Sequence, residues 1–343
     1  MSRNYAVGFL AALLSLASTA SAQAPLPREA TDGAFMDPFP LGIVLDVNPS
    51  GGSSNLNGIL EPGEVILVQP LFFNPNLSFP LTLVTSASNF AGPTGAAYTI
   101  VDGIAGYQLP EGGAAFCSDC YVLSLDDPSP RPAAHWDASF DDSWSGLQQH
   151  VQTWVMHVGR SFSDVPPEYP FYYGVEDLFH YGVTAGCGTG LYCPSSPVTR
   201  AQIAVFLLKA EHGSAYVPPP CAGVFTDVAC PSPFSDWIEA LHAEGVSAGC
   251  GSGAYCPHES VRRRQMAVLL LRANQGASYV PPPAVGIFGD VPVDDPFAPW
   301  IEDLYNRNIT AGCQATPLMF CPDSIVTRGQ TGFFVGYTFH MSL

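Results

Sequence analysis

Residues 197–208, "PVTRAQIAVFLL", have two close counterparts further along this chain of 343 residues: "VRRRQMAVLLL" from Val261 and "VTRGQTGFFVG" from Val326. Each copy joins a polar opening to an apolar run, which predicts the start of a buried helix. Each copy also places an arginine in the first helical turn, where the helix dipole disfavours a cation. Any explanation of this arginine must therefore hold three times.

The three copies belong to a longer repeated unit. Two of its landmarks recur at intervals of 63 residues: the motif F-x-D-V at Phe162, Phe225 and Phe288, and the first cysteine of a close pair at Cys187, Cys250 and Cys313. The sequence of each unit predicts two helices. The first helix ends near Gly182 in the first unit, Gly245 in the second and Asn308 in the third. Glycine and asparagine readily adopt the left-handed conformation that ends a helix, so their exchange supports this boundary.

The second helix of each unit has a recognisable start. Two copies predict a T-x-x-Q capping box, formed by Thr199 with Gln202 and by Thr327 with Gln330. The middle copy keeps Gln265 but has Arg262 in place of the threonine, so we expect its cap to shift to Ser260.

Residues 162–343 resemble the S-layer homology (SLH) domain. The resemblance rests on the order F-x-D-V, a first helix, "GVTAG", a short loop that ends in an aromatic residue and proline, and "VTRAQ". It implies three all-α repeats at 162–222, 225–285 and 288–343, assembled with pseudo-threefold symmetry, and grooves that bind cell-envelope polysaccharide noncovalently. The family motif usually ends in glutamate, but the glutamine found here also completes a capping box. Cysteine pairs are not a general feature of the family.

Three interpretations of Arg200, Arg263 and Arg328 compete. The arginines are solvated charges, they pair with Asp164, Asp227 and Asp290 of the F-x-D-V motifs, or they clamp an anionic or sugar ligand. The resemblance favours the clamp, because these arginines match the family position that contacts ligand. A pure clamp predicts that glutamine substitutions leave stability nearly unchanged, whereas an ion pair predicts a loss.

Sugar binding also needs flat aromatic side chains. Trp237 and Trp300 lie 63 residues apart at equivalent positions of the first helices, so we predict that they line the grooves. The first unit has Gly174 at this position, and either the neighbouring Tyr173 substitutes for the tryptophan or the first groove is degenerate. The alternative for both tryptophans is a place in the helical core.

Residues 1–22 resemble an export signal, with Arg3, the apolar run "AVGFLAALLSLA" and small residues ending at Ala22. The run is shorter than the roughly 20 apolar residues of a membrane helix, so we expect an exported protein of the cell surface or periplasmic envelope without a transmembrane segment. The net charge of −18 becomes −19 when Arg3 is removed, which argues against nucleic acid as a partner.

Ten cysteines form five close pairs in the sequence. An even count at short spacing in an exported chain predicts five local disulfides, at 117/120, 187/193, 221/230, 250/256 and 313/321 (Cys117, Cys120, Cys187, Cys193, Cys221, Cys230, Cys250, Cys256, Cys313 and Cys321). A zinc site and a redox-active "CSDC" at 117–120 are the weaker alternatives. We expect neither a metal nor a cofactor.

Residues 23–158 predict a different, all-β domain. Runs such as "EVILVQPLFF" and "VQTWVMHV", separated by Gly, Pro, Asn and Asp, indicate an antiparallel sandwich of immunoglobulin-like type. The segment from Asp46 resembles the first half of a calcium loop, but its twelfth position is Asn57 rather than glutamate. His135, Asp137, Asp141 and Asp142 could bind a metal, although a solvated acidic loop fits "HWDASFDDSW" better.

The sequence contains neither G-x-S-x-G nor H-E-x-x-H, and its eight histidines are scattered. We therefore expect a binding and anchoring protein rather than an enzyme, with envelope polysaccharide or peptidoglycan-linked glycan as its partner. Two alternatives stay open: a self-assembling, S-layer-like structural subunit, and an enzyme with its site in the sandwich.

Overall fold

The computed structural model describes residues 35–49, 53–133 and 136–341. The chain divides into two compact units between Ser161 and Phe162. The predicted export signal at 1–22 lies outside the described residues.

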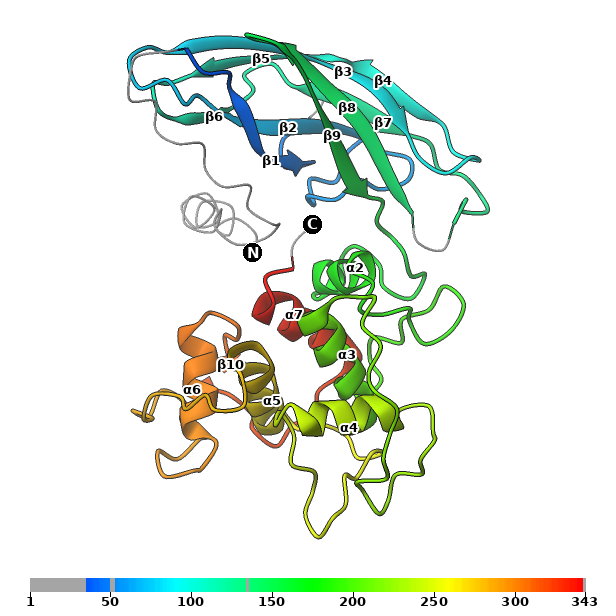
Figure 1. Ribbon diagram of the computed structural model, residues 1–343, viewed down its shortest axis with the longest axis vertical. Coiled ribbons are helices and arrows are strands. Elements are labelled where there is room, and N and C mark those ends of the chain that lie inside the picture. Colours follow the sequence, from blue (N-terminus) through cyan, green and yellow to red (C-terminus); the bar gives the residue numbers. More distant parts are fainter. Residues whose placement is uncertain (1–34, 50–52, 134–135, 342–343) are drawn as a thin grey trace. The chain divides into compact units, whose positions relative to one another are not determined.

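The N-terminal unit contains two antiparallel sheets (Figure 1). The first sheet has the order β1 (Phe39–Leu45), β2 (Val65–Phe73), β7 (Tyr121–Leu125) and β4 (Tyr98–Asp102), with β6 (Ala114–Phe116) also paired to β2. The second has the order β5 (Ile104–Leu109), β3 (Leu81–Ala91), β8 (Asp137–Ser145) and β9 (Gln149–His157).

The inner faces of both sheets share one core. Side chains alternate between buried and partly exposed along β2, which buries Ile66, Val68 and Phe72, and along β8, which buries Phe140 and Trp144. This period of two residues places one face of each sheet against the other. The predicted β-rich N-terminal region is therefore confirmed.

The prediction of an acidic loop around residues 135–144 is wrong from Asp137 onward. Asp137–Ser145 form β8, which is paired to both β3 and β9. The acidic residues occupy outward positions or are hydrogen-bonded: the buried carboxylate of Asp142 accepts from the Tyr121 hydroxyl at 2.6 Å and the Trp154 indole at 3.2 Å. Apolar residues alternate with polar ones along much of "DASFDDSW", a period of two residues that is typical of a strand despite the three aspartates.

The C-terminal unit is helical, as predicted. Its helices are α2 (Tyr172–His180), α3 (Arg200–His212), α4 (Ser235–Ala243), α5 (Arg263–Gln275), α6 (Ala298–Asn306) and α7 (Arg328–Thr338). The last cysteine loop is two residues longer than the others and contains a small hairpin of β10 (Gln314–Ala315) and β11 (Leu318–Met319). Gly182, Gly245 and Asn308 all have positive φ angles, of 67°, 74° and 60°, as expected for helix ends.

The helices pack in a cyclic order. Helix α3 packs on α4, α5 packs on α6, and α7 returns to α2 (Figure 1). Each pair thus joins the second helix of one repeated stretch to the first helix of the next. One continuous hydrophobic core, which includes Leu178, Leu241 and Leu304 of the first helices, runs through the unit.

Candidate functional site

Three short extended segments meet where the second helices begin. Val198, Val261 and Val326 are fully buried. Their backbones form a closed cycle of hydrogen bonds: Val198 N donates to Val326 O, Val326 N to Val261 O and Val261 N to Val198 O, at 2.9 to 3.0 Å. Each valine immediately precedes the N-cap residue of α3, α5 or α7, so this cycle positions the three helix starts.

The predicted capping boxes are present in two of the three helices. Thr199 and Gln202 satisfy each other's backbone N–H groups at 3.2 and 3.1 Å, and Thr327 and Gln330 do so at 3.3 and 3.1 Å. In the middle helix the N-cap is Arg262, and the predicted shift to Ser260 is wrong. Gln265 accepts from Arg262 N at 2.9 Å, but a guanidinium has no acceptor atom, so only half of the box exists.

The next repeated stretch supplies the missing acceptors of each helix start. Arg200 N donates to Glu259 O and Arg263 N donates to Ser324 O, each at 2.9 Å, while Arg328 N donates to Ser196 O at 2.8 Å. These backbone contacts satisfy N–H groups that have no partner within the helix.

The arginine side chains make the same cyclic contacts, and they are buried. Their Nε atoms donate at 2.8 Å to the carbonyl of the aromatic residue in the neighbouring cysteine loop: Arg200 to Tyr255, Arg263 to Phe320 and Arg328 to Tyr192. The guanidinium carbons lie 4.7 to 4.8 Å from the centroids of these same rings. Only 5 to 6% of each arginine is exposed, so the solvated-charge interpretation is wrong.

Two of these arginines keep an unused donor. The Nη2 atoms of Arg263 and Arg328 are buried and make no hydrogen bond among the described residues, whereas Nη2 of Arg200 donates weakly to Ser247 Oγ at 3.4 Å. Burial lowers the pKa of Arg263 to about 10 and also lowers that of Arg328. Each of these two guanidinium groups therefore contains a buried N–H without an acceptor among the described residues.

The aspartates of the F-x-D-V motifs bind the backbone N–H of the same aromatic residue whose carbonyl binds the arginine. Asp227 accepts from Tyr255 N at 2.8 Å and from Cys256 N at 2.7 Å. Asp164 does the same for Tyr192 and Cys193, and Asp290 for Phe320 and Cys321, at the same distances. The described residues show no direct ion pair between these aspartates and the arginines. The two charges instead meet through one residue, whose N–H binds the aspartate and whose carbonyl binds the arginine.

All ten cysteines form the five predicted local disulfides. Cys187–Cys193, Cys250–Cys256 and Cys313–Cys321 close the loops that carry the aromatic residues, with Cα atoms 6.0 Å apart in each. Their sulfur atoms lie near Asp227 or Asp290 in the second and third loops, but a disulfide sulfur is not a thiolate ligand.

The predicted aromatic platforms are partly buried. Trp237 lies 6.0 Å from the ring of Tyr216, and Trp300 lies 6.2 Å from that of Tyr279, each in an edge-on arrangement. Both tryptophans pack against the helical core with part of their surface exposed. Tyr173 is 46% exposed.

A buried glutamate that the sequence did not predict recurs in the first helix of each unit. Glu239 accepts from the backbone N–H groups of Ala222, Gly223 and Val224, and Glu302 accepts from those of Val285, Gly286 and Ile287, at 2.5 to 3.0 Å. Glu176 occupies the equivalent position and is fully buried. The interval of 63 residues between these glutamates was a readable signal.

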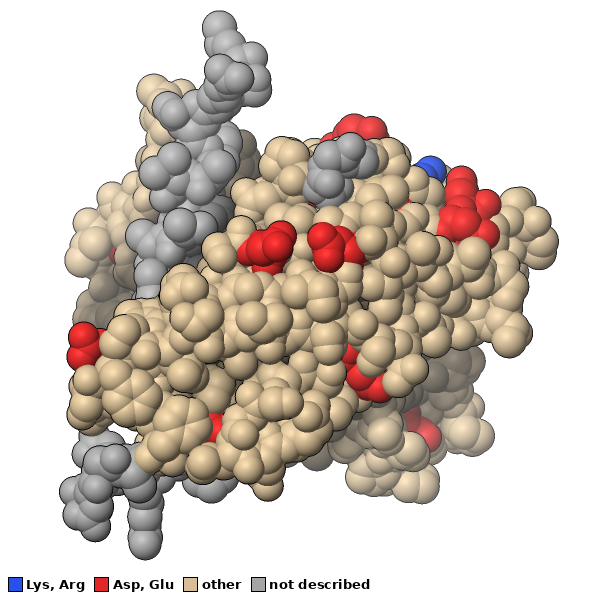
Figure 2. Space-filling model, turned by 90° about the horizontal axis from the view of Figure 1, so that it is seen from above, with Lys and Arg blue, Asp and Glu red and all other residues tan. Residues whose placement is uncertain are grey.

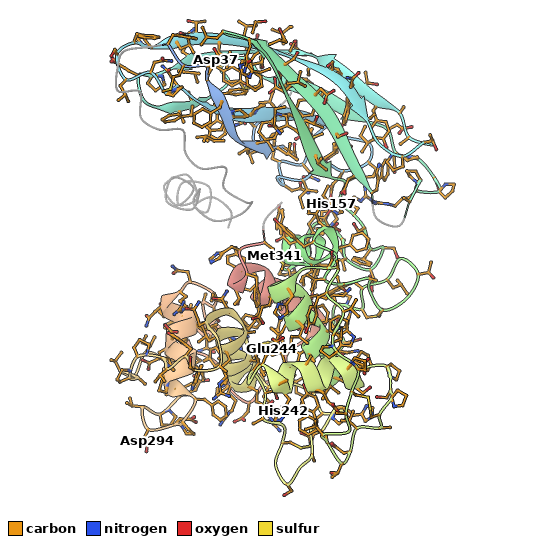
Figure 3. All side chains as sticks on the ribbon, viewed as in Figure 1. Asp37, His157, His242, Glu244, Asp294 and Met341 are labelled. Carbon is orange, nitrogen blue, oxygen red and sulfur yellow. A yellow bond between two sulfur atoms is a disulfide. The ribbon has the colours of Figure 1, made fainter. Side chains whose placement is uncertain are left out.

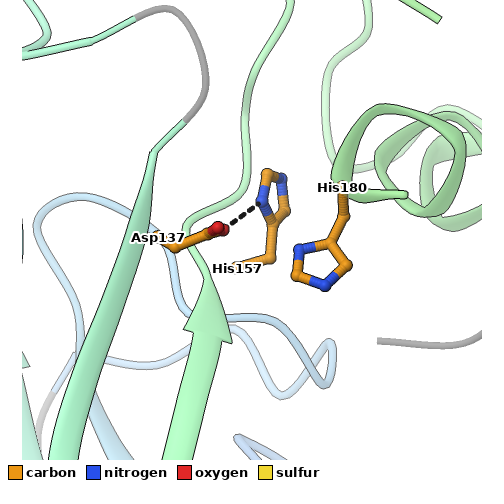
Figure 4. A group of neighbouring side chains, drawn as sticks. All are labelled: Asp137, His157 and His180. Atoms are coloured by element: carbon orange, nitrogen blue, oxygen red, sulfur yellow. Dashed lines mark hydrogen bonds and ion pairs between the residues drawn. The ribbon is translucent and has the colours of Figure 1, made fainter. Parts of the chain in front are cut away.

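The possible metal ligands of the sandwich have other partners. His135 lies outside the described residues. Asp137 Oδ1 is 3.3 Å from His157 Nδ1 (Figure 4), and Asp141 accepts from Asn89 and Thr153 at 2.8 and 2.6 Å.

Near the predicted half calcium loop, Asp46 is buried and bonds to the Ser54 hydroxyl and to Asn57 N. Two more buried carboxylates, Glu61 and Glu64, come later in the sequence, and Glu64 lies close enough to Asp46 for their charges to interact. Burial and the charges of Glu61 and Asp46 raise the pKa of Glu64 to about 7.

Basic side chains are sparse on the face drawn in Figure 2, where acidic residues are scattered among uncharged ones. Within the described part of the chain, no helix is long and apolar enough to cross a bilayer.

The similar proteins cover only part of this chain. An endoglucanase of Bacillus sp. (strain KSM-635) is 28% identical over 122 residues, which are 33% of this chain and 12% of the endoglucanase. Among solved structures, the GAE domain of GGA2p from Saccharomyces cerevisiae aligns with 14% identity over 29% of this chain and 80% of that domain, with a TM-score of only 0.16.

The family comparison identifies one segment. Residues 161–204 match the S-layer homology domain. This segment contains the first F-x-D-V motif, helix α2, the first cysteine loop and Arg200 at the start of α3. The chain therefore carries an S-layer homology match within its helical unit.

Proposed function

We propose that this protein is exported and anchored noncovalently to the bacterial cell envelope by three S-layer homology repeats. The match at residues 161–204 supports the first repeat. The other two are supported by three contacts around Arg200 that recur at Arg263 and Arg328: the bond to the loop carbonyl, the aspartate cap of that loop and its disulfide. The closed valine cycle fits a pseudo-threefold assembly.

The ligand in this proposal is an acidic envelope polysaccharide. The observation that supports it is the buried Nη2 donor without a protein acceptor on both Arg263 and Arg328. An anionic or hydroxyl group of a ligand that displaces the covering side chains would satisfy this donor. The partly exposed Trp237 and Trp300 offer apolar surface to a sugar ring. The resemblance to the family implies pyruvyl or other acidic groups on such glycans.

For the N-terminal unit we propose an immunoglobulin-like sandwich that is displayed by the anchor. Its two antiparallel sheets and their shared core support this assignment. We propose no catalytic role for it. The partial likeness to an endoglucanase favours a test for hydrolysis of β-glucan by the full chain, and turnover would contradict the proposal.

Binding to purified envelope fractions tests the anchor. The folded protein should co-sediment with isolated peptidoglycan carrying its linked polysaccharide, and stripping the polysaccharide should abolish co-sedimentation. Arg263→Gln and Arg328→Gln should each weaken binding about tenfold or more, since a charge-assisted contact contributes about 1.5 to 3 kcal/mol. Arg262→Gln is the matched control, because this neighbouring arginine is half exposed and pairs with Asp323.

Two outcomes would contradict the proposal. Unchanged binding by a triple variant of Arg200, Arg263 and Arg328, measured on folded protein, would exclude the clamp. Assembly into sheets without glycan, with no binding to envelope fractions, would favour the structural-subunit alternative.

A further inference from the structure

We propose that Glu211, His212 and Glu244 bind one divalent transition-metal ion of the Zn²⁺ class. Glu211 and His212 end α3, and Glu244 directly follows α4, which packs against α3 (Figure 3 labels Glu244). One possible ligand atom from each residue lies within 4.8 Å of the other two. One imidazole and two carboxylates are ligands that zinc commonly takes, with water in the fourth position.

The spacing of these atoms suits a tetrahedral ion. His212 Nε2 lies 3.0 Å from Glu244 Oε1 and 4.0 Å from Glu211 Oε2. Ligands about 2.0 to 2.1 Å from zinc stand roughly 3.4 Å apart in a tetrahedron, so the observed distances bracket the required value. All three side chains are about one third exposed, which leaves the site open to ions from solution.

The electrostatics of this corner favour a cation. Helices α3 and α4 both end here, and the last carbonyls of a helix carry partial negative charge. Among the described residues, His212 is the ion-pair partner of both glutamates, and Lys209 of the same helix donates instead to Gly182 O.

One carboxylate oxygen of the cluster lacks a well-formed hydrogen bond. Glu244 Oε2 is buried and makes no hydrogen bond among the described residues, although Oε1 of the same carboxylate contacts His212. A buried carboxylate oxygen without a donor is unfavourable. Burial and the neighbouring charge of Glu244 raise the pKa of Tyr216, so the Tyr216 hydroxyl is close to this carboxylate. A metal ion bound beside His212 would be a stronger partner.

The equivalent corner of the molecule already contains a cation. Adding 63 to each position leads to Asn274, Gln275 and Arg307 at the ends of α5 and α6. There the Arg307 guanidinium donates to Asp303 at 3.0 Å and to the Tyr279 hydroxyl at 2.8 Å. At the α3–α4 corner a glutamate replaces the arginine and Ala240 replaces Asp303, so His212 or a bound ion can supply a positive charge there.

The rival explanation is a protonated His212 that forms ion pairs with the two glutamates. A zinc titration distinguishes this ion pair from a metal site, because a metal-bound imidazole must be unprotonated on the ligating nitrogen. The full chain, freed of metal with EDTA, is titrated with ZnCl₂ in a calorimeter at pH 7.5. We expect one Zn²⁺ per chain, with the affinity lowered at least about tenfold in both His212→Ala and Glu244→Gln. His258→Ala is the matched control, because His258 is exposed in the same unit and lies outside the cluster.

A second variant protects the test against misfolding. Glu244→Arg copies the residue of the α5–α6 corner and should fold normally, as judged by circular dichroism, but bind no Zn²⁺ at this site. Co²⁺ should give the intense visible absorption of a tetrahedral complex in the native chain only. Absence of stoichiometric zinc binding, or binding that survives in His212→Ala and Glu244→Arg, would overturn the proposal.

Discussion

The helix pair α2–α7 and the pairs α3–α4 and α5–α6 are built on the same frame but differ where the helices meet. Equivalent positions hold Trp237 in α4, Trp300 in α6 and Gly174 in α2. A Cβ atom added to Gly174 would lie 2.7 Å from the backbone of Gly332 in α7. One pair is thus closed by backbone contact, while the other two present a large aromatic ring. The difference teaches that the arginine contacts are common to all three junctions, whereas the surface offered to a ligand is not.

The largest loss of stability should come from placing a tryptophan in the α2–α7 junction, at the position where the other two junctions have one. Gly174→Trp places a bulky side chain against the backbone of α7, which cannot move aside as a flexible side chain would. We expect a loss of more than about 4 kcal/mol in the free energy of unfolding, in the range that single substitutions rarely reach. Urea unfolding followed by circular dichroism measures this.

The reverse change provides the control for the closed junction. Trp300→Gly removes a partly exposed ring and should cost less stability than Gly174→Trp, while weakening glycan binding more. If Gly174→Trp is tolerated and improves glycan binding, the first groove is open and merely lacks its platform, and the comparison fails.

Substitution of Glu239 and Glu302 tests whether the α3–α4 and α5–α6 junctions are equally stable. Glu302→Ala leaves the N–H groups of Val285, Gly286 and Ile287 without their acceptor. We expect a loss of about 3 kcal/mol, because these are charge-assisted bonds to a buried carboxylate. Glu239→Ala should give the same loss within experimental error, and unequal losses would show that these junctions are not energetically equivalent.

The arginines should matter equally at all three junctions. Glutamine at position 328 is too short to reproduce the bond from Nε to Tyr192 O and loses the contact with its ring. We expect each of Arg200→Gln, Arg263→Gln and Arg328→Gln to cost about 2 kcal/mol of stability. Thermal unfolding of the three variants side by side measures this. A dispensable Arg328 would indicate that backbone contact between α2 and α7 already holds that junction.

This expectation differs from the one that the sequence supports for a pure clamp, which leaves stability unchanged. A helix start disfavours a cation only while its charge faces the free N–H groups of its own helix. Here the side chain reaches the carbonyl of the neighbouring loop, and the N–H groups are satisfied by Glu259, Ser324 and Ser196. The contact joins residues 55 to 136 positions apart, so no local pattern in the sequence could reveal it.

Local patterns predicted most of the rest. The repeat interval located the helices, the left-handed ends at Gly182 and Asn308 followed from residue type, and cysteine spacing gave all five disulfides. The sequence did not predict β8, because three aspartates within six residues resemble a loop, although one of them, Asp142, lies on the buried face of the strand. It also missed Glu244, whose neighbours in the cluster are 32 and 33 positions away.

The smallest predicted effect is a gain. The hydroxyl of Tyr192 donates to Arg328 O at 2.8 Å and that of Tyr255 to Arg200 O at 3.0 Å, whereas the third loop has the fully buried Phe320 at this position. Phe320→Tyr should add the missing bond to Arg263 O and raise the free energy of unfolding by about 1 kcal/mol. Tyr255→Phe is the matched reverse change and should lose a similar amount, as urea unfolding can measure. If Phe320→Tyr destabilises the protein, its hydroxyl is buried without an acceptor. The third loop, lengthened by two residues, then sits differently on α5 than the other loops sit on α3 and α7.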